Sequence, residues 1–277
     1  MLKIRLVAKI DVKDHQVVKG VRLEGLRVLG SAELFAEKYF LEGIDEIFYH
    51  DVIASLLGRN ALLELIKNTA KNIFIPITVS GGVRTLKDIY NLLNSGADRV
   101  SLNSEVFKNK NIISQAVKEF GSTTIINSMD IGKINNKYFL FTENGKNKQE
   151  ENLIDWIKKI QDFGVGEFVI NAIHKDGTLE GIDHELLNII EGNVNVPYIF
   201  GGGIGKREDL KNISSLKKIN GIFLSSILHY NYIDKNYSDN FGNTAFLQSN
   251  IFKKKVEKNN IQSIKSFLKK NKIECRV

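Results

Sequence analysis

The sequence predicts an α/β fold, a TIM (β/α)8 barrel made of two fused half-barrels, and two observations predict it. Eight short apolar runs of β type alternate with amphipathic helical stretches, and eight such units in roughly 250 residues are the count and size of that barrel. Residues that follow the strands also recur about 120 positions later, as an internal repeat would produce. We expect one domain over residues 1–277, with half-barrels at about 1–120 and 121–277 and a polar insertion at about 231–251.

Each expected element rests on its own pattern. Runs rich in β-branched and aromatic residues predict the strands, at residues 4–10, 46–50, 75–79, 99–102, 123–129, 167–173, 197–200 and 221–224. Apolar residues at helical spacing predict the helices between them, at residues 32–41, 60–71, 86–94, 112–120 and 153–163. Asn135-Asn136, at the centre of residues 133–142, predicts a hairpin after the fifth strand.

The internal repeat places similar residues after equivalent strands of the two halves. The pairs are Asp11 with Asp130, Asp51 with Asp176, Gly82 with Gly203, and Asn103-Ser104 with Ser225-Ser226. In a TIM barrel the carboxyl ends of the strands meet at one mouth, which carries the active site. We therefore expect these residues to converge there.

Asp11 and Asp130 are the candidate catalytic residues. Apolar neighbours such as Ile10 and Met129 are expected to raise the pKa of a carboxyl, and a protonated and an ionised carboxyl together form a general acid and base. Alternatively, either aspartate caps a loop. Asp51 and Asp176 are interpreted as orienting groups.

The Gly-Gly turns at Gly82 and Gly203 leave backbone N–H groups available to an anion. The polar pairs Asn103-Ser104 and Ser225-Ser226 add further donors at the next strand end. Each half therefore predicts one phosphate site, although a lone Gly-Gly turn is often only a tight turn.

Composition excludes several classes of protein. The net charge of +7 is carried by the segment 253–277, where a helix with Ile261, Ile264 and Leu268 on one face is expected to expose Lys265, Lys269 and Lys270 to solvent. Without an aromatic platform these lysines do not favour nucleic-acid binding. No apolar run is long enough for a membrane span, so we expect a cytoplasmic protein. The five histidines lack metal-ligand spacing, and neither a metal nor another cofactor is expected.

Several motifs, taken in order, resemble a known family. They are Asp11-Val12-Lys13, Val17-Val18-Lys19-Gly20, Asp51, Gly81-Gly82, residues 96–100 (Gly-Ala-Asp-Arg-Val), Asp130, Asp176-Gly177-Thr178 and Gly202-Gly203. Together they resemble the cyclase subunit of imidazole glycerol phosphate synthase. The resemblance implies that the protein reacts ammonia with a bis-phosphorylated ribulosyl aminoimidazole carboxamide, giving imidazole glycerol phosphate and aminoimidazole carboxamide ribotide.

The resemblance also implies roles for individual residues. Asp11 and Asp130 would be the catalytic acid and base, with the order left open, and Lys19 would belong to the substrate loop. The two phosphate sites would comprise the groups Gly82, Asn103, Ser104 and Gly177, Gly203, Ser225.

Departures from the family pattern keep other functions open. Ser80 replaces a glycine, and His174 stands where an aspartate is usual. The sequence of the expected flexible loop at residues 21–30 resembles that of a group of paralogues. These paralogues are thought to supply ammonia for amidating a nucleotide-linked sugar in surface-polysaccharide biosynthesis. A phosphosugar isomerase of the sister barrel family and a non-catalytic barrel that activates a glutaminase are the remaining alternatives.

The chain itself lacks the means to release ammonia from glutamine. That reaction by the thiol route needs a positioned cysteine, and the single Cys275, near the C-terminus, is not expected to be a buried nucleophile. The resemblance implies a separate glutaminase subunit. The family's charged ring at the barrel floor is matched by Arg5, Glu46, Arg99 and Glu167. This ring is interpreted either as a structural feature or as an ammonia gate. Asp98 would lie on the face that docks the glutaminase.

Overall fold

Eight parallel strands close into a barrel in the computed structural model, which describes residues 3–53, 62–236 and 256–276. The barrel strands are β1 (Arg5–Lys13), β4 (Glu46–Asp51), β5 (Ile77–Ser80), β6 (Arg99–Leu102), β7 (Ile125–Ile134), β10 (Glu167–Ala172), β11 (Tyr198–Gly201) and β12 (Ile219–Leu224). Strand β1 pairs in parallel with both β4 and β12, and β10 pairs with both β7 and β11. The sheet therefore closes on itself, as the sequence predicts for a TIM barrel.

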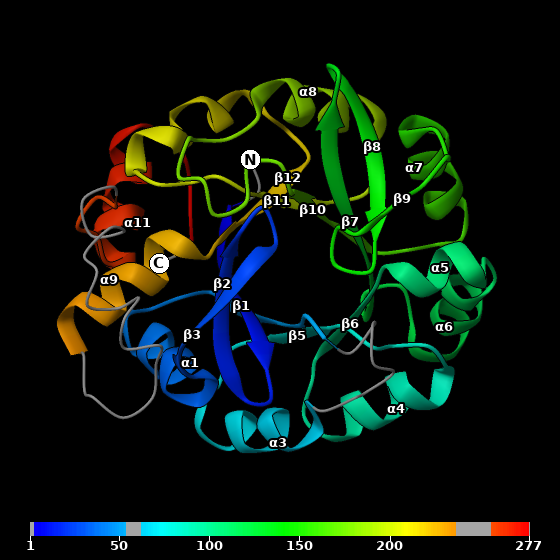
Figure 1. Ribbon diagram of the computed structural model, residues 1–277, viewed down its shortest axis with the longest axis horizontal. Helices are drawn as coiled ribbons and strands as arrows, with labels where there is room; N and C mark the ends of the chain where they lie inside the picture. Colours follow the sequence, from blue (N-terminus) through cyan, green and yellow to red (C-terminus); the bar gives the residue numbers. More distant parts are fainter. Residues whose placement is uncertain (1–2, 54–61, 237–255, 277) are drawn as a thin grey trace.

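Helices surround the strands as an outer ring (Figure 1). Those described are α1 (Ala32–Leu41), α3 (Leu63–Asn72), α4 (Leu86–Asn94), α5 (Ser104–Lys108), α6 (Ile112–Phe120), α7 (Leu153–Asp162), α8 (His184–Asn193), the 3₁₀ helix η1 (Arg207–Ser215), α9 (Ser226–Asn236) and α11 (Ile261–Lys270). Helix α4 has its predicted bounds because Thr85 and Asp88 form a capping box at its start. The helices that the sequence does not predict are α5, α8, η1 and α9.

Two β-hairpins extend from the mouth of the barrel (Figure 1). The predicted hairpin is confirmed: β7 pairs with β8 (Lys137–Thr142), and Asn135 and Asn136 adopt φ angles of 48° and 60° at the turn. The short β9 (Asn147–Lys148) continues it. The expected loop at residues 21–30 is part of a β-hairpin, and its flexibility stays a prediction. Strand β2 (Gln16–Val21) pairs with β3 (Glu24–Ser31) through a turn at Arg22 and Leu23 with φ angles of 53° and 64°.

Alternate residues of each barrel strand form layers inside the barrel, since side chains along a strand point to opposite faces in turn. On β1 the order from floor to mouth is Arg5, Val7, Lys9 and Asp11, all buried. Val7 belongs to an apolar cluster of its own, formed by Val7, Phe48, Ile126, Val169, Ile199 and Phe223. A charged floor, an apolar middle and a polar mouth thus follow from period-two alternation.

The C-terminal segment packs against the barrel through α11. Ile261, Ile264 and Leu268 are buried, as their spacing predicts. The expectation that Lys265 is solvated is wrong, because its Nζ lies 2.6 Å from Asp45 Oδ1 and the residue is only 5% exposed. Cys275 is buried as well, since it bridges to Ile4 beside β1.

The predicted insertion at 231–251 is only partly covered by the structure. Helix α9 extends through its first residues to Asn236, and residues 237–255 lie outside the described residues. The division into two half-barrels near residue 120 stays a prediction.

Candidate active site

Asp11 lies in a buried cluster of charges at the mouth. Its carboxylate is 2.9 Å from Lys9 Nζ, 3.5 Å from Lys19 Nζ and 3.1 Å from His50 Nδ1. Asp176 pairs with the same two lysines, at 3.6 Å for Lys9 and in closer contact for Lys19. Strands β1, β2 and β4 and the loop after β10 thus bring these groups together.

This cluster reverses the expected pKa shift of Asp11. Burial alone would raise the pKa of its carboxyl, but the charges of Lys9 and Lys19, with His50, hold that pKa well below its usual range. The prediction that the apolar surroundings of Asp11 raise its pKa is therefore wrong. Lys9, two residues earlier on the same strand, faces the same side of the sheet and supplies the nearest positive charge.

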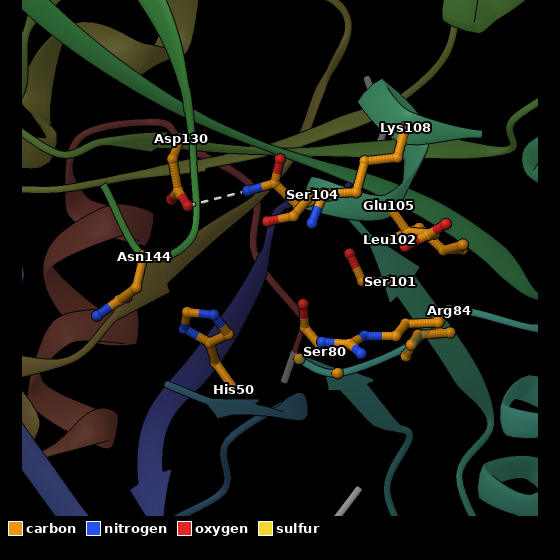
Figure 2. A pocket seen from close by; sticks show the side chains of 14 residues that line it. His50, Ser80, Arg84, Ser101, Leu102, Ser104, Glu105, Lys108, Asp130 and Asn144 are labelled. Atoms are coloured by element: carbon orange, nitrogen blue, oxygen red, sulfur yellow. Dashed lines mark hydrogen bonds between the residues drawn. The ribbon is translucent and has the colours of Figure 1, made fainter. Parts of the chain in front are cut away.

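Asp130 has different surroundings. Its carboxylate accepts hydrogen bonds of 3.0 Å from the side-chain amides of Asn103 and Asn171, the first of which is drawn in Figure 2. Burial raises the pKa of Asp130 above its ordinary value, although His50 and Lys9 lower it. Of the two aspartates, Asp130 therefore holds a proton more readily and Asp11 stays ionised.

Lys9, His50 and Asn171 belong to this site but are not among the candidates predicted from sequence. All three lie on barrel strands, and each faces the interior, where it contacts a candidate aspartate. Period-two alternation from Asp11 gives Lys9. His50 and Asn171 become apparent only when register places His50 beside Asp11 and Asn171 beside Asp130.

The first pocket at the mouth brings together Gly82, Asn103 and Ser104, as predicted for one phosphate site. Figure 2 shows His50, Ser80, Arg84, Lys108 and Asp130 around the same space. The Asn103 amide is engaged by Asp130, and Ser104 Oγ accepts a hydrogen bond from the Glu143 N–H at 3.0 Å. The adjacent Gly81 adopts a φ of 103°, and a Cβ there would lie 2.4 Å from the Asp51 carbonyl oxygen.

The second pocket brings together the equivalent group from the other half. Its lining includes Gly177, Gly203, Ser225 and Ser226, together with Asp176. Gly203 has a φ of 92°, and a Cβ at this position would lie 2.3 Å from the Gly181 carbonyl oxygen. Glycine is thus required for this turn, which leaves the pocket open.

Asp51, interpreted from the sequence as an orienting group, contacts backbone groups after β4 and at the Gly81 turn, and its orienting role stays a prediction. Its Oδ1 accepts a hydrogen bond of 3.0 Å from the Ile53 N–H, and its backbone contacts the Gly81 turn. Asp176 is more central than expected, because it shares both lysines with Asp11.

His174, which stands where the family pattern has an aspartate, belongs to a rim contact. Its Nε2 lies 2.7 Å from Asp183 Oδ2, and the Tyr138 hydroxyl donates to the same carboxylate at 3.0 Å. Asp183 also caps α8 through the Leu186 N–H. This contact ties the β7–β8 hairpin to α8.

The four predicted charges at the opposite end of the barrel form a closed ring of ion pairs. Arg5 and Arg99 each contact both Glu46 and Glu167, with Arg5 Nη1 2.9 Å from Glu46 Oε2. Asp98, next to Arg99, is exposed, and its Oδ2 accepts a hydrogen bond of 2.7 Å from the Ile77 N–H. The ring spans the barrel floor beneath the apolar layer.

Among residues 3–53, 62–236 and 256–276, no group of three His, Cys, Asp or Glu side chains is placed to hold a metal ion. Within those ranges, none of the helices combines the length and apolar character that crossing a membrane requires.

Comparison with known proteins agrees with this geometry. A family model described as "Histidine biosynthesis protein" matches residues 5–234. The imidazole glycerol phosphate synthase subunit HisF of Legionella pneumophila is 40% identical over 210 residues, 76% of this chain and 99% of the relative. The same subunit of Natranaerobius thermophilus is 39% identical over 241 residues, 86% and 96% of the two chains. On this match and these similarities, the chain belongs to the histidine biosynthesis protein family.

Proposed function

We propose that this chain is the ammonia-dependent cyclase subunit of imidazole glycerol phosphate synthase, a lyase of histidine biosynthesis. One observation carries the proposal. Two buried carboxylates with opposite pKa shifts lie at a mouth that has a glycine-lined pocket in each half. Asp130 lines the first pocket, and Asp176, which shares its lysines with Asp11, lines the second. A substrate with a phosphate at each end fits this arrangement.

The two aspartates divide the proton transfers between them. Addition of ammonia to the ketone of a ribulosyl group requires that a proton leave nitrogen and that another reach oxygen. Asp11, held ionised by Lys9 and Lys19, is the general base. Asp130, whose pKa is raised by burial, is the general acid.

The pockets differ in how they hold a phosphate. Arg84 and Lys108 line the first pocket and supply positive charge beside the Gly82 turn. In the second pocket the donors are the backbone at Gly203 and the hydroxyls of Ser225 and Ser226. Phosphate soaked into crystals is therefore expected at both turns, and an ordered pair of anions elsewhere would contradict the substrate.

The interior of the barrel is suited to passage of neutral ammonia from the floor to the mouth. The ring of Arg5, Glu46, Arg99 and Glu167 forms the entrance, and the apolar cluster that includes Val7 and Phe48 lies above it. An apolar layer disfavours ions far more than a small neutral molecule. Ammonia released at the floor would thus pass, whereas ammonium would be retained.

The partner in this proposal is a separate glutaminase subunit docked on the floor. Asp98 lies there. Two apolar side chains near the amino ends of other strands, Leu41 at the last position of α1 and Phe74 between α3 and β5, are 73% and 81% exposed. Exposed apolar side chains next to charges are typical of interfaces. The relatives' printed names, which call them subunits, support an assembly of this kind.

The partner is tested with a co-encoded glutaminase. Asp98→Arg should weaken the one-to-one complex and reduce glutamine-dependent turnover, while turnover with ammonium salt is kept. Glu64→Arg, the same charge reversal on an exposed residue at the mouth end of α3, is the matched control. Unchanged glutamine coupling in Asp98→Arg would contradict the docking face.

The activity is tested with the purified chain, ammonium salt and the bis-phosphorylated substrate. Asp11→Asn and Asp130→Asn should each keep the fold and lower kcat by at least ~10²-fold. Asp155→Asn, on the exposed first turn of α7, should retain the wild-type rate. Wild-type rates in either active-site variant would refute the assignment of its aspartate.

A second acceptor, a nucleotide-linked sugar, is favoured by the β2–β3 hairpin. The hairpin sequence resembles the polysaccharide paralogues, and it contacts the second pocket, since the Arg22 N–H donates to the Asp176 carbonyl oxygen at 2.8 Å. Complementation of a histidine auxotroph that lacks the cyclase separates the two acceptors. Growth supports the histidine intermediate, and failure with a stably expressed protein favours the sugar.

A further inference from the structure

Three side chains behind the second pocket form a continuous hydrogen-bonded chain. The Tyr39 hydroxyl lies 2.7 Å from His229 Nδ1, and His229 Nε2 lies 3.1 Å from Ser225 Oγ. Tyr39 on α1 is 1% exposed and His229 on α9 is fully buried. Of these three residues, only Ser225 lines the second pocket.

The direction of these hydrogen bonds is fixed by the tyrosine proton. Burial lowers the pKa of His229 to about 3 and raises that of Tyr39 well above its usual value, so a neutral imidazole meets a protonated phenol. A neutral imidazole has one donor and one acceptor nitrogen. If Tyr39 donates to Nδ1, then Nε2–H donates to Ser225 Oγ. The reverse order would leave the buried Tyr39 proton without an acceptor among the described residues, which disfavours it by roughly 5- to 150-fold.

The consequence concerns the Ser225 hydroxyl. Because its oxygen already accepts a hydrogen bond from His229, its own proton is free to point toward an anion in the pocket. None of the described residues that line this pocket is a lysine, arginine or histidine. A phosphate in the second pocket must therefore be bound by neutral hydrogen-bond donors instead of the cations that line the first pocket. The orientation of each donor thus matters more in the second pocket than in the first.

A second observation also points to a ligand in this pocket. Ser226, the first residue of α9, is 5% exposed, and its Oγ has no hydrogen-bond partner among the described residues. Buried hydroxyls are normally hydrogen-bonded. The first N–H groups of a helix also lack intrahelical acceptors and favour an anion.

We propose that Tyr39 and His229 are positioning residues that fix Ser225 as a hydrogen-bond donor to the phosphate group of the substrate in the second pocket. The inference rests on the proposed function, because that function places a phosphate there. The chain Tyr39–His229–Ser225 acts only on this end of the substrate. The first pocket should not depend on it.

The experiment titrates the full-length, ¹⁵N-labelled protein with inorganic phosphate. The amide signal of Gly203 reports the second pocket and that of Gly82 the first. Tyr39→Phe should weaken phosphate binding at Gly203 by roughly 10- to 100-fold, as expected for loss of a hydrogen bond to a charged group, with binding at Gly82 unchanged. His229→Gln, whose amide can accept from Tyr39 and donate to Ser225, should retain most of the affinity. His229→Leu should not.

A double-mutant cycle separates positioning from a general structural effect. Ser225→Ala should weaken binding at Gly203, and adding Tyr39→Phe to it should have no further effect. In turnover with ammonium salt, Tyr39→Phe should raise KM for the bis-phosphorylated substrate more than it lowers kcat. Equal losses at both glycines, full additivity in the cycle, or unchanged affinity at Gly203 would each overturn the inference.

These readouts distinguish this inference from the proposed function. If wild-type Gly203 responds to phosphate but Tyr39→Phe binds equally well, the positioning role fails and the proposed function stands. If phosphate binds as expected and Tyr39→Phe weakens it, but the wild type does not turn over the bis-phosphorylated substrate, only the assigned reaction fails. No response of wild-type Gly203 would overturn the second phosphate site together with this inference.

Discussion

Replacing Lys9 with methionine should change the pH dependence of catalysis through Asp11. Lys9 Nζ lies 2.9 Å from Asp11 Oδ1, and both residues are buried. At an effective dielectric constant of about 20, two charges at this distance attract by ~6 kcal/mol, which corresponds to ~4 pKa units. Burial of the charges opposes this attraction, and Lys19 still lies 3.5 Å from Asp11. An increase of about 1–3 units in the pKa of Asp11 is therefore expected.

The sign follows from the role of Asp11 as a base. A carboxylate with a depressed pKa stays active as the pH falls until that pKa is reached. In Lys9→Met the acidic limb of the kcat profile should accordingly move by about 1–3 units toward neutral pH. The assay follows turnover of saturating bis-phosphorylated substrate, with the concentration of free ammonia held constant across the pH range.

The chain offers a matched control for the loss of a buried lysine. Lys265 is 5% exposed and pairs with Asp45 at 2.6 Å, near the amino end of β4 and far from the mouth. Removing Lys265 leaves the buried Asp45 carboxylate without this ion pair, which costs about 3–5 kcal/mol. Lys265→Met should thus destabilise the fold without moving the acidic limb. An unmoved limb in Lys9→Met, or an equal movement in both variants, would refute the reasoning.

Two further predictions concern stability. Burial lowers the pKa of His229 to about 3, against an ordinary value near 6.5 for histidine. Between these pH values the unfolded chain therefore binds more protons than the folded chain. The free energy of unfolding should fall by up to ~1.4 kcal/mol per pH unit on acidification through that window. Urea titrations across this window should show a smaller pH dependence of stability in His229→Gln than in His184→Gln, an exposed position. Equal pH dependences in the two variants would contradict the prediction. Gly203→Ala should destabilise the protein more than Gly121→Ala: both glycines have positive φ angles, but a Cβ at Gly121 has no atom within 4 Å. Gly203→Ala alone should also abolish phosphate binding in the second pocket, and comparable behaviour of the two variants in unfolding and phosphate titrations would argue against the turn.

Much of the fold could be predicted from local sequence. Strand β6 and helices α1, α4 and α6 have the predicted bounds, because apolar periodicity and capping residues act over a few positions. The sequence does not predict the hairpin formed by β2 and β3. Its turn is formed by Arg22 and Leu23 at positive φ, whereas the residues typical of such turns are Asn, Asp and Gly.

The candidate site could be predicted in part for the same reason. Residues at the carboxyl ends of strands must meet at one mouth, so Asp11, Asp130 and the two glycine turns were predictable from position alone. Lys265 was placed wrongly because its buried partner, Asp45, is 220 residues away in the chain. A helical pattern carries no information about such a partner.

The sequence by itself determined the barrel, the positions of its strands, and the two aspartates and glycine turns at its mouth, because these depend on periodicity and on the ends of elements. Only the tertiary structure decided the electrostatic state of those residues. Asp11 is flanked by apolar side chains in the sequence, yet in the fold it lies beside Lys9, Lys19 and His50. A pKa depends on charges a few ångströms away in space, and strand register and closure of the barrel bring those charges together.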